Sequence, residues 1–235
     1  MTTPPAIVAP APGRYVPVLA EGDILAALPL RDQRGRAVTI TGDGRTTIVS
    51  FIYTRCRDAR MCPLVAAKFA AMQRALPDDR IRLVTVTLDP AYDTPAVLAR
   101  YGASVGADPE RWTLATGNPG TIDELATRLG IVRSVPQPGV VVHSEAAVVI
   151  DRNARIARIV DGSEWLPADL LATARDVDGG RVSLLSAARL WLAQTVARCG
   201  SAAPAIGTAA VLGILGLFVL IYGALFRRMS NTSAR

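Results

Sequence analysis

The chain has 235 residues, half of them hydrophobic, which is enough for one domain with a full core and an additional segment. Its formal net charge is +6, but the arginines are scattered and form no dense basic tract, which argues against nucleic-acid binding. Three cysteines, an odd number, in a chain of this length exclude a small disulfide-stabilised scaffold.

The first part of the chain is rich in proline. Residues 1–22 contain five prolines, which disfavour a helix, so we expect a disordered or extended tail. The same residues show no basic stretch followed by an apolar one, so they do not resemble a secretory signal.

Strand-like and helix-like patterns alternate over residues 23–177, which predicts one layered α/β domain. The expected strands, rich in β-branched residues, are 37–40, 46–53, 81–88, 112–115, 140–142, 146–150 and 156–160. The expected helices are 63–76, 94–101, 121–129 and 166–175. The last two strands flank a short polar turn and are expected to form a hairpin.

The C-terminal part has a different character. Residues 178–201 are predicted to be a linker with an amphipathic helical stretch, and residues 227–235 a short basic tail. Residues 202–226 contain no charged side chain, and a helix of about 20 apolar residues spans a bilayer core. We therefore expect one transmembrane helix there.

Two of the cysteines lie close together in a pattern typical of a functional site. Cys56 follows a buried strand, and Cys62 precedes a helix whose first residue is predicted to be Pro63. A thiol at a helix start faces unsatisfied N–H groups and the positive end of the helix dipole, which favours the thiolate. The neighbouring Arg57 and Arg60 act in the same direction. The sequence predicts a metal-binding or redox pair.

The only histidine of the chain, His143, follows three valines and is expected at the end of a strand. Ligand-binding groups of α/β folds gather at such strand ends. Two thiolates and one imidazole form a soft site suited to Cu(I), although the same three ligands can bind zinc. Without a metal, Cys56 and Cys62 can instead cycle through a disulfide.

Several motifs in residues 28–171 resemble, in the same order, those of the Sco/SenC family. They are Phe51–Cys56 with Cys62-Pro63, Leu88–Pro90 with Asp93–Pro95, Gly106–Thr113 with Gly117, and His143-Ser144 with Ile150–Arg152. The resemblance implies a thioredoxin-like fold with a β-hairpin insertion, and copper bound by Cys56, Cys62 and His143. It also implies a partner, cytochrome c oxidase subunit II or another copper protein, whose binuclear copper site the family helps to assemble. Asp89 matches a motif aspartate, for which we expect at most a supporting role around the ligands.

The sequence departs from the family pattern in three ways. The family spacing is three residues between the cysteines, whereas five separate Cys56 from Cys62 here. Tyr92 stands where the family often has arginine. The family is usually anchored by an N-terminal helix, whereas the apolar segment here is C-terminal.

The favoured hypothesis is a copper metallochaperone for an oxidase, with no enzymatic activity required. The alternative is a membrane-anchored thiol–disulfide oxidoreductase that uses Cys56 and Cys62 as its redox pair. A peroxidase would need a threonine near its reactive cysteine, and Thr54 is available, but the surrounding sequence does not fit that class.

These hypotheses place the protein in the inner membrane as a single-pass protein with its soluble domain in the periplasm. Arginines follow the apolar segment closely, which slightly favours a cytoplasmic C-terminus. Cys199, at the predicted membrane edge, has no expected catalytic role, although it can cross-link a dimer.

Overall fold

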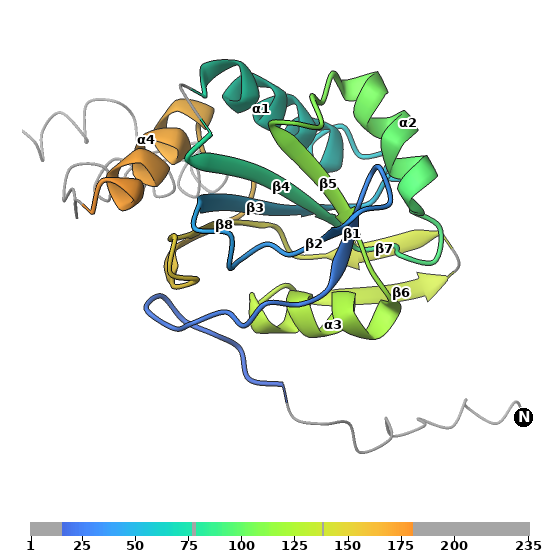
Figure 1. The fold of residues 1–235 in the computed structure, drawn as a ribbon. Helices are drawn as coiled ribbons and strands as arrows, with labels where there is room; N and C mark the ends of the chain where they lie inside the picture. The colour runs from blue at the N-terminus through green and yellow to red at the C-terminus, as the bar shows by residue number, and fades with distance from the viewer. Residues whose placement is uncertain (1–15, 77–78, 138, 181–235) are drawn as a thin grey trace, which may run out of the picture. The chain divides into compact units, whose positions relative to one another are not determined.

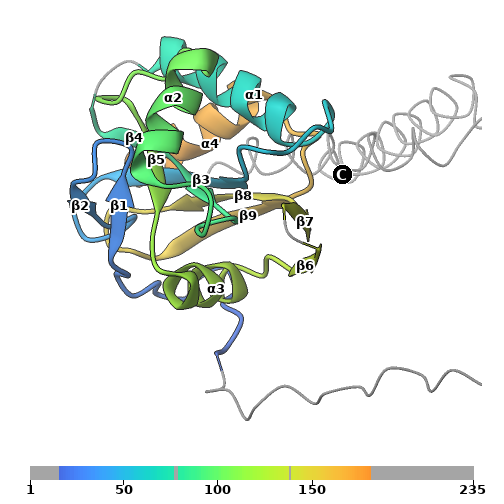
Figure 2. The same cartoon turned by 90° about the vertical axis from the view of Figure 1, so that its right-hand side faces the viewer.

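A mixed sheet of seven strands forms the middle layer of the fold, in the order β2-β1-β5-β4-β3-β8-β9 (Figures 1 and 2). The computed structural model describes residues 16–76, 79–137 and 139–180. The strands of this sheet are β1 (Leu30–Asp32), β2 (Ala37–Val38), β3 (Thr46–Ile52), β4 (Ile81–Thr87), β5 (Trp112–Thr116), β8 (Ala146–Ile150) and β9 (Ile156–Asp161). Two further strands, β6 (Arg133–Gln137) and β7 (Val140–His143), pair with each other outside the sheet as an antiparallel hairpin.

The middle of the sheet is parallel and fully buried. Strand β3 pairs in parallel with β4, and β4 pairs in parallel with β5. Every residue of β3 and β4 is buried, as expected for strands that are covered on both faces. The carboxyl ends of these three strands meet at one edge of the sheet, where α/β folds place their ligand sites.

Helices cover both faces of the sheet. Helices α1 (Cys62–Ala75), α2 (Pro95–Val105) and α4 (Pro167–Asp178) lie on one face, and α3 (Pro119–Arg128) lies on the other (Figures 1 and 2). Residues of β3 contribute to the hydrophobic clusters on both faces of the sheet. Ile48 and Ile52 belong to the cluster around α1, whereas Val49 and Phe51 belong to the cluster that contains Leu125 of α3. Burial of these two apolar layers is the main force that holds the sheet between its helices.

The predicted elements are confirmed with shifts of a few residues at their ends. Two short strands were missed. Strand β1 has only three residues, and β6 contains Pro136, a residue that disfavours strands. Helix α2 extends beyond the predicted Tyr101 to Val105 and ends at Gly106, whose φ of 71° suits glycine.

The predicted transmembrane helix at 202–226 lies outside the described residues, as do most of the predicted linker, the basic tail and residues 1–15. Within the part of the chain that the structure describes, no helix combines the length and apolar character needed to cross a bilayer.

Candidate metal or thiol centre

The two cysteines lie in the connection between β3 and α1, and the histidine ends β7. The backbone N–H of Cys56 donates to the carbonyl of Tyr53 over 3.2 Å, which turns the chain as it leaves β3. Cys62 is the first residue of α1 and Pro63 the second, one position later than predicted. His143 occupies the last position of β7, as predicted. Segments that are distant in sequence therefore meet at the carboxyl edge of the sheet.

Cys62 and His143 are in contact inside the protein. The Sγ of Cys62 lies 3.9 Å from Nε2 of His143, and the two residues are only 1% and 8% exposed. The Nδ1 atom of His143 lies 2.9 Å from the carbonyl oxygen of Ser144. A carbonyl oxygen can only accept, so Nδ1 carries a proton, and in the neutral imidazole the free lone pair is then on Nε2, the atom that contacts the thiol. The structure thus positions a sulfur and a nitrogen ligand side by side.

Cys56 lies beside this pair but is more open to solvent. Its thiol is free, half-buried and 4.0 Å from the carbonyl oxygen of Asp58. The ring of Tyr53 stands edge-on to His143, with the ring centroids 6.0 Å apart. Among the described residues, no three His, Cys, Asp or Glu side chains are already arranged to hold a metal ion. The structure therefore brings Cys62 and His143 into contact, with Cys56 near enough to influence the Cys62 thiol.

The prediction that the helix start favours a thiolate at Cys62 is wrong for this metal-free arrangement. Burial raises the pKa of the Cys62 thiol, and hydrogen bonding and charge at Cys56 raise it further, although a backbone hydrogen bond involving Tyr53 opposes both. The cost of burying a charge exceeds the help from the helix dipole, which acts only near the helix end. A metal ion that used Cys62 as a ligand would have to displace its proton.

An arginine that the motifs did not single out organises the open side of the site. Arg55 donates from Nη2 and Nε to Oδ2 of Asp89, over 2.5 and 3.1 Å. Its guanidinium also lies over the ring of Tyr92, 4.0 Å from the ring centroid. Asp89 thus supports the residue next to Cys56 and does not itself contact the thiols. Both Arg55 and Cys56 line an open hollow of about 680 Å³.

A glycine lies close to the guanidinium of Arg55. Gly139 has a φ of +83°, and a Cβ atom at this position would lie 2.9 Å from Nη1 of Arg55. The sequence signal that could have revealed it is a glycine immediately before the apolar strand that leads to His143.

Thr54 is directed away from the thiols. Its backbone N–H donates to Oδ2 of Asp93 over 3.0 Å, and its hydroxyl donates to Oδ1 of the same carboxyl. Burial raises the pKa of Asp93, which also accepts a hydrogen bond from Thr87. Thr54 therefore anchors the loop, and its hydroxyl is not offered to a peroxide at Cys56.

The comparisons with known proteins agree on one family. The family model described as SCO1/SenC matches residues 20–177. The SCO1 protein homolog of Bacillus subtilis (strain 168) is 24% identical over 145 residues, which are 59% of this chain and 74% of the relative.

Solved structures of Sco proteins share the fold. Bradyrhizobium japonicum ScoI with copper bound is 26% identical, with a TM-score of 0.54 over 67% of this chain and 99% of that chain. BsSco, a member of the Sco family of cytochrome c oxidase assembly proteins with a disulfide switch, is 19% identical, with a TM-score of 0.57 over 66% and 94% of the two chains. The expected thioredoxin-like architecture is thereby confirmed. Because the family model spans well over half of the chain, the protein belongs to the SCO1/SenC family.

Proposed function

We propose that this protein is a copper metallochaperone that binds one Cu(I) through Cys56, Cys62 and His143 and assists assembly of the binuclear copper site of cytochrome c oxidase. Family membership and the copper-bound Bradyrhizobium relative support copper as the cargo. The oxidase assembly role of BsSco supports the partner, for which subunit II is the specific candidate.

One observation carries the proposal. The 3.9 Å contact between Cys62 Sγ and His143 Nε2 joins residues that are 81 positions apart in the sequence. The hydrogen bond from Nδ1 to Ser144 leaves the metal-binding nitrogen facing the sulfur. Two thiolates and an imidazole are soft ligands that suit Cu(I), whereas a structural zinc site would call for a fourth ligand.

The unequal exposure of the two cysteines fits a protein that must release its metal. The half-buried Cys56 can be approached by a thiol of the partner, while Cys62 and His143 keep the ion in place until a second ligand arrives. Each ligand exchange then breaks one bond from copper to a Cys or His donor as a bond to the partner forms, so the ion is never free.

The proposal extends to the position of the protein in the cell. We infer a single C-terminal membrane helix at 202–226 in the inner membrane, with the copper-binding domain in the periplasm. An alkaline phosphatase fusion to the domain tests this topology, because activity is expected only if the domain has been exported.

Anaerobic Cu(I) titration of the full chain in detergent, against a chromophoric competitor, tests the site. Wild type is compared with His143→Ala and Cys62→Ala, and with Cys199→Ser as a control for the loss of a thiol outside the site. We expect one tightly bound Cu(I) in wild type and in the control, with much weaker binding in both site variants. Wild-type affinity in His143→Ala would show that the three-ligand site is wrong.

A second function is favoured by the proximity of the two free thiols. Both thiols are free, and the Cys56 thiol is near enough to raise the pKa of Cys62 in addition to the larger effect of burial. A membrane-anchored thiol–disulfide oxidoreductase would oxidise both thiols to a disulfide while reducing a partner disulfide to two thiols. Disulfide reduction that persists at the wild-type rate in His143→Ala, together with absent Cu(I) binding in wild type, would favour this function.

A further inference from the structure

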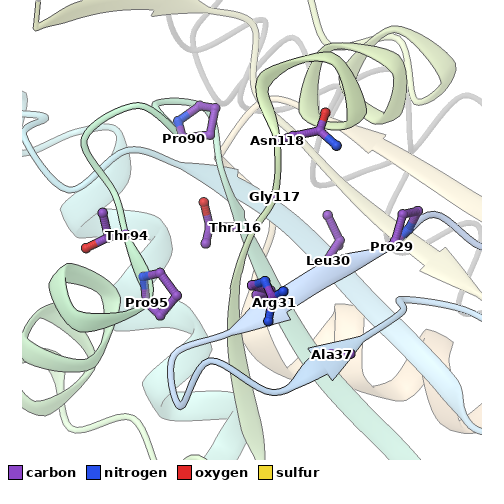
Figure 3. Close-up of a pocket in the computed structure, with 10 residues that line it drawn as sticks. All are labelled: Pro29, Leu30, Arg31, Ala37, Pro90, Thr94, Pro95, Thr116, Gly117 and Asn118. Atoms are coloured by element: carbon purple, nitrogen blue, oxygen red, sulfur yellow. The ribbon is translucent and has the colours of Figure 1, made fainter.

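A second hollow opens at the carboxyl edge of the sheet, away from the cysteines. It has a volume of about 470 Å³ and lies between β1, the start of α2 and the start of α3 (Figure 3). Its lining residues come from these segments, from β2, from the end of β5 and from the loop after β4, and they are Pro29, Leu30, Arg31, Ala37, Pro90, Thr94, Pro95, Thr116, Gly117 and Asn118. Neither cysteine of the thiol centre nor His143 belongs to this lining, so the hollow is separate from the proposed copper site.

Two helices begin at this hollow. Thr94 caps α2 and Asn118 caps α3, and in each helix the first residue is proline. Both helices have at least ten residues. In each helix the first residue has no N–H and the third N–H donates to the capping side chain, but the helix dipole still gives each of these ends a partial positive charge. Two such ends at one hollow favour an anion over a cation.

A guanidinium adds a full positive charge. Arg31 makes one hydrogen bond among the described residues, from Nη1 to the carbonyl of Gly35, and no ion pair with them. A guanidinium has five N–H donors, so most of its hydrogen-bonding capacity is left for a ligand or solvent. No Asp or Glu belongs to the lining, so nothing in the wall itself neutralises the charge.

A buried hydroxyl without a partner gives the independent sign of a ligand. Thr116 is 4% exposed, and its Oγ1 has no hydrogen-bond partner in the described structure. Burying an unpaired hydroxyl is unfavourable, so such a group calls for an explanation. Thr116 stands directly opposite Arg31 in the pairing of β5 with β1, and directly opposite residues project on the same side of a sheet. Figure 3 shows Thr116 amid the lining residues, with its hydroxyl directed toward the side where Pro90 lies.

We propose that this hollow binds the oxyanion group of a small molecule, a phosphate or a carboxylate. The guanidinium of Arg31 and the hydroxyl of Thr116 donate to the oxyanion, and the positive ends of the two helix dipoles add to the attraction. The apolar walls, which include Pro29, Leu30 and Pro95, accommodate the carbon portion of the molecule. Gly117 allows its backbone to lie close to the Leu30 side chain, because a Cβ at this position would lie only 3.1 Å from Cδ2 of Leu30.

Calorimetric titration of the full chain in detergent, at constant ionic strength, tests the proposal with inorganic phosphate and, separately, with acetate. The variants are Arg31→Gln and Thr116→Val, which remove the charge and the hydroxyl with little change in side-chain size. Arg100→Gln is the control for charge, since Arg100 is exposed on α2 outside the lining. Thr41→Val is the control for the hydroxyl, because Thr41 is also 4% exposed with an unpaired Oγ1 but lies outside the hollow.

We expect saturable binding of at least one probe, weakened about tenfold or more by Arg31→Gln and several-fold by Thr116→Val. The two controls keep wild-type affinity, and so does Cu(I) binding in all four variants. The probe that binds more tightly identifies the ligand as a phosphate or a carboxylate. The proposal would be overturned if neither probe showed saturable binding, or if wild type and Arg31→Gln bound the probe with equal affinity. Neither result would affect the proposed copper site.

Discussion

The thiol centre has two halves that are built differently. Cys62 and His143 are almost fully buried, one at the first position of a helix and the other at the end of a strand. Cys56 is half-buried, and the four residues that follow it, 57–60, are exposed. The buried half is fixed by the core, whereas the open half is held chiefly by turns and by the Arg55–Asp89 ion pair.

In the proposed copper site, the buried half would hold the metal ion, and the open half would allow its exchange with a partner. Donor atoms fixed by packing do not need to be ordered when a metal arrives, so they contribute affinity. A donor on an exposed loop is easily reached by another protein, so it contributes to transfer. We therefore expect changes in the buried half to alter binding most strongly.

The largest effect is expected from exchanging each cysteine for serine. Cys62→Ser should lower Cu(I) affinity by more than about a hundredfold, because even residues that only support metal ligands cost 10 to 100-fold. Cys56→Ser should retain weak binding, since the buried sulfur and nitrogen remain adjacent. Competition with a chromophoric Cu(I) chelator measures both. A greater loss in Cys56→Ser than in Cys62→Ser would reverse the assignment of the two halves.

Alkylation of the reduced, copper-free protein is expected to distinguish the thiols. Burial raises the pKa of Cys62, so its thiolate is scarce at pH 7 and increases as the pH rises toward that pKa. At pH 7 we expect Cys62 to react with iodoacetamide at least about tenfold more slowly than Cys56, because each unit of pKa lowers the thiolate about tenfold.

Mass spectrometry of peptides from a Cys199→Ser background follows each site in that experiment. The rate at Cys62 should increase steeply between pH 7 and pH 10. Equal rates at pH 7 would mean that Cys62 is not protected by burial.

Removal of the Arg55 side-chain charge should have a moderate effect on stability. Arg55→Gln breaks the ion pair with Asp89, in which the two side chains are 35% and 11% exposed, and weakens the contact with Tyr92. We expect the free energy of unfolding to fall measurably but modestly, because solvent screens a partly exposed ion pair. Urea unfolding measures it, with the exposed Arg57→Gln as the matched control. A similar loss in both variants would remove the special role of Arg55.

The smallest effect is expected from shortening the loop. Deleting Ala59 and Arg60 restores a three-residue spacing between Cys56 and Cys62, and both deleted residues are exposed. The free energy of unfolding should change by less than about 1 kcal/mol, because loop-closure entropy varies slowly with length. Thermal unfolding with and without Cu(I) measures this, and a large loss of folding stability would show that the longer loop is part of the core structure.

Sequence patterns predicted the layered fold and brought Cys56, Cys62 and His143 into one hypothesis. The buried β3 and β4 are rich in β-branched and apolar residues, and the caps of α2 and α3 are local, so such elements can be recognised without tertiary information. The raised pKa of Cys62 was not predictable, because its cause is burial by residues that are distant in sequence. The Arg55–Asp89 pair and the unpaired hydroxyl of Thr116 likewise depend on contacts between separate loops and strands.

The hydrogen bond from Nδ1 of His143 to the carbonyl of Ser144 has a practical consequence, because this is the only imidazole in the chain. Nitrogen-15 labelling of histidine gives an NMR spectrum with a single pair of ring signals, provided that purification avoids a histidine tag. The acceptor belongs to the backbone, so side-chain substitutions around the site leave it in place. The protein thus carries its own spectroscopic reporter, in which the proposed binding of copper should shift the Nε2 signal more than the Nδ1 signal.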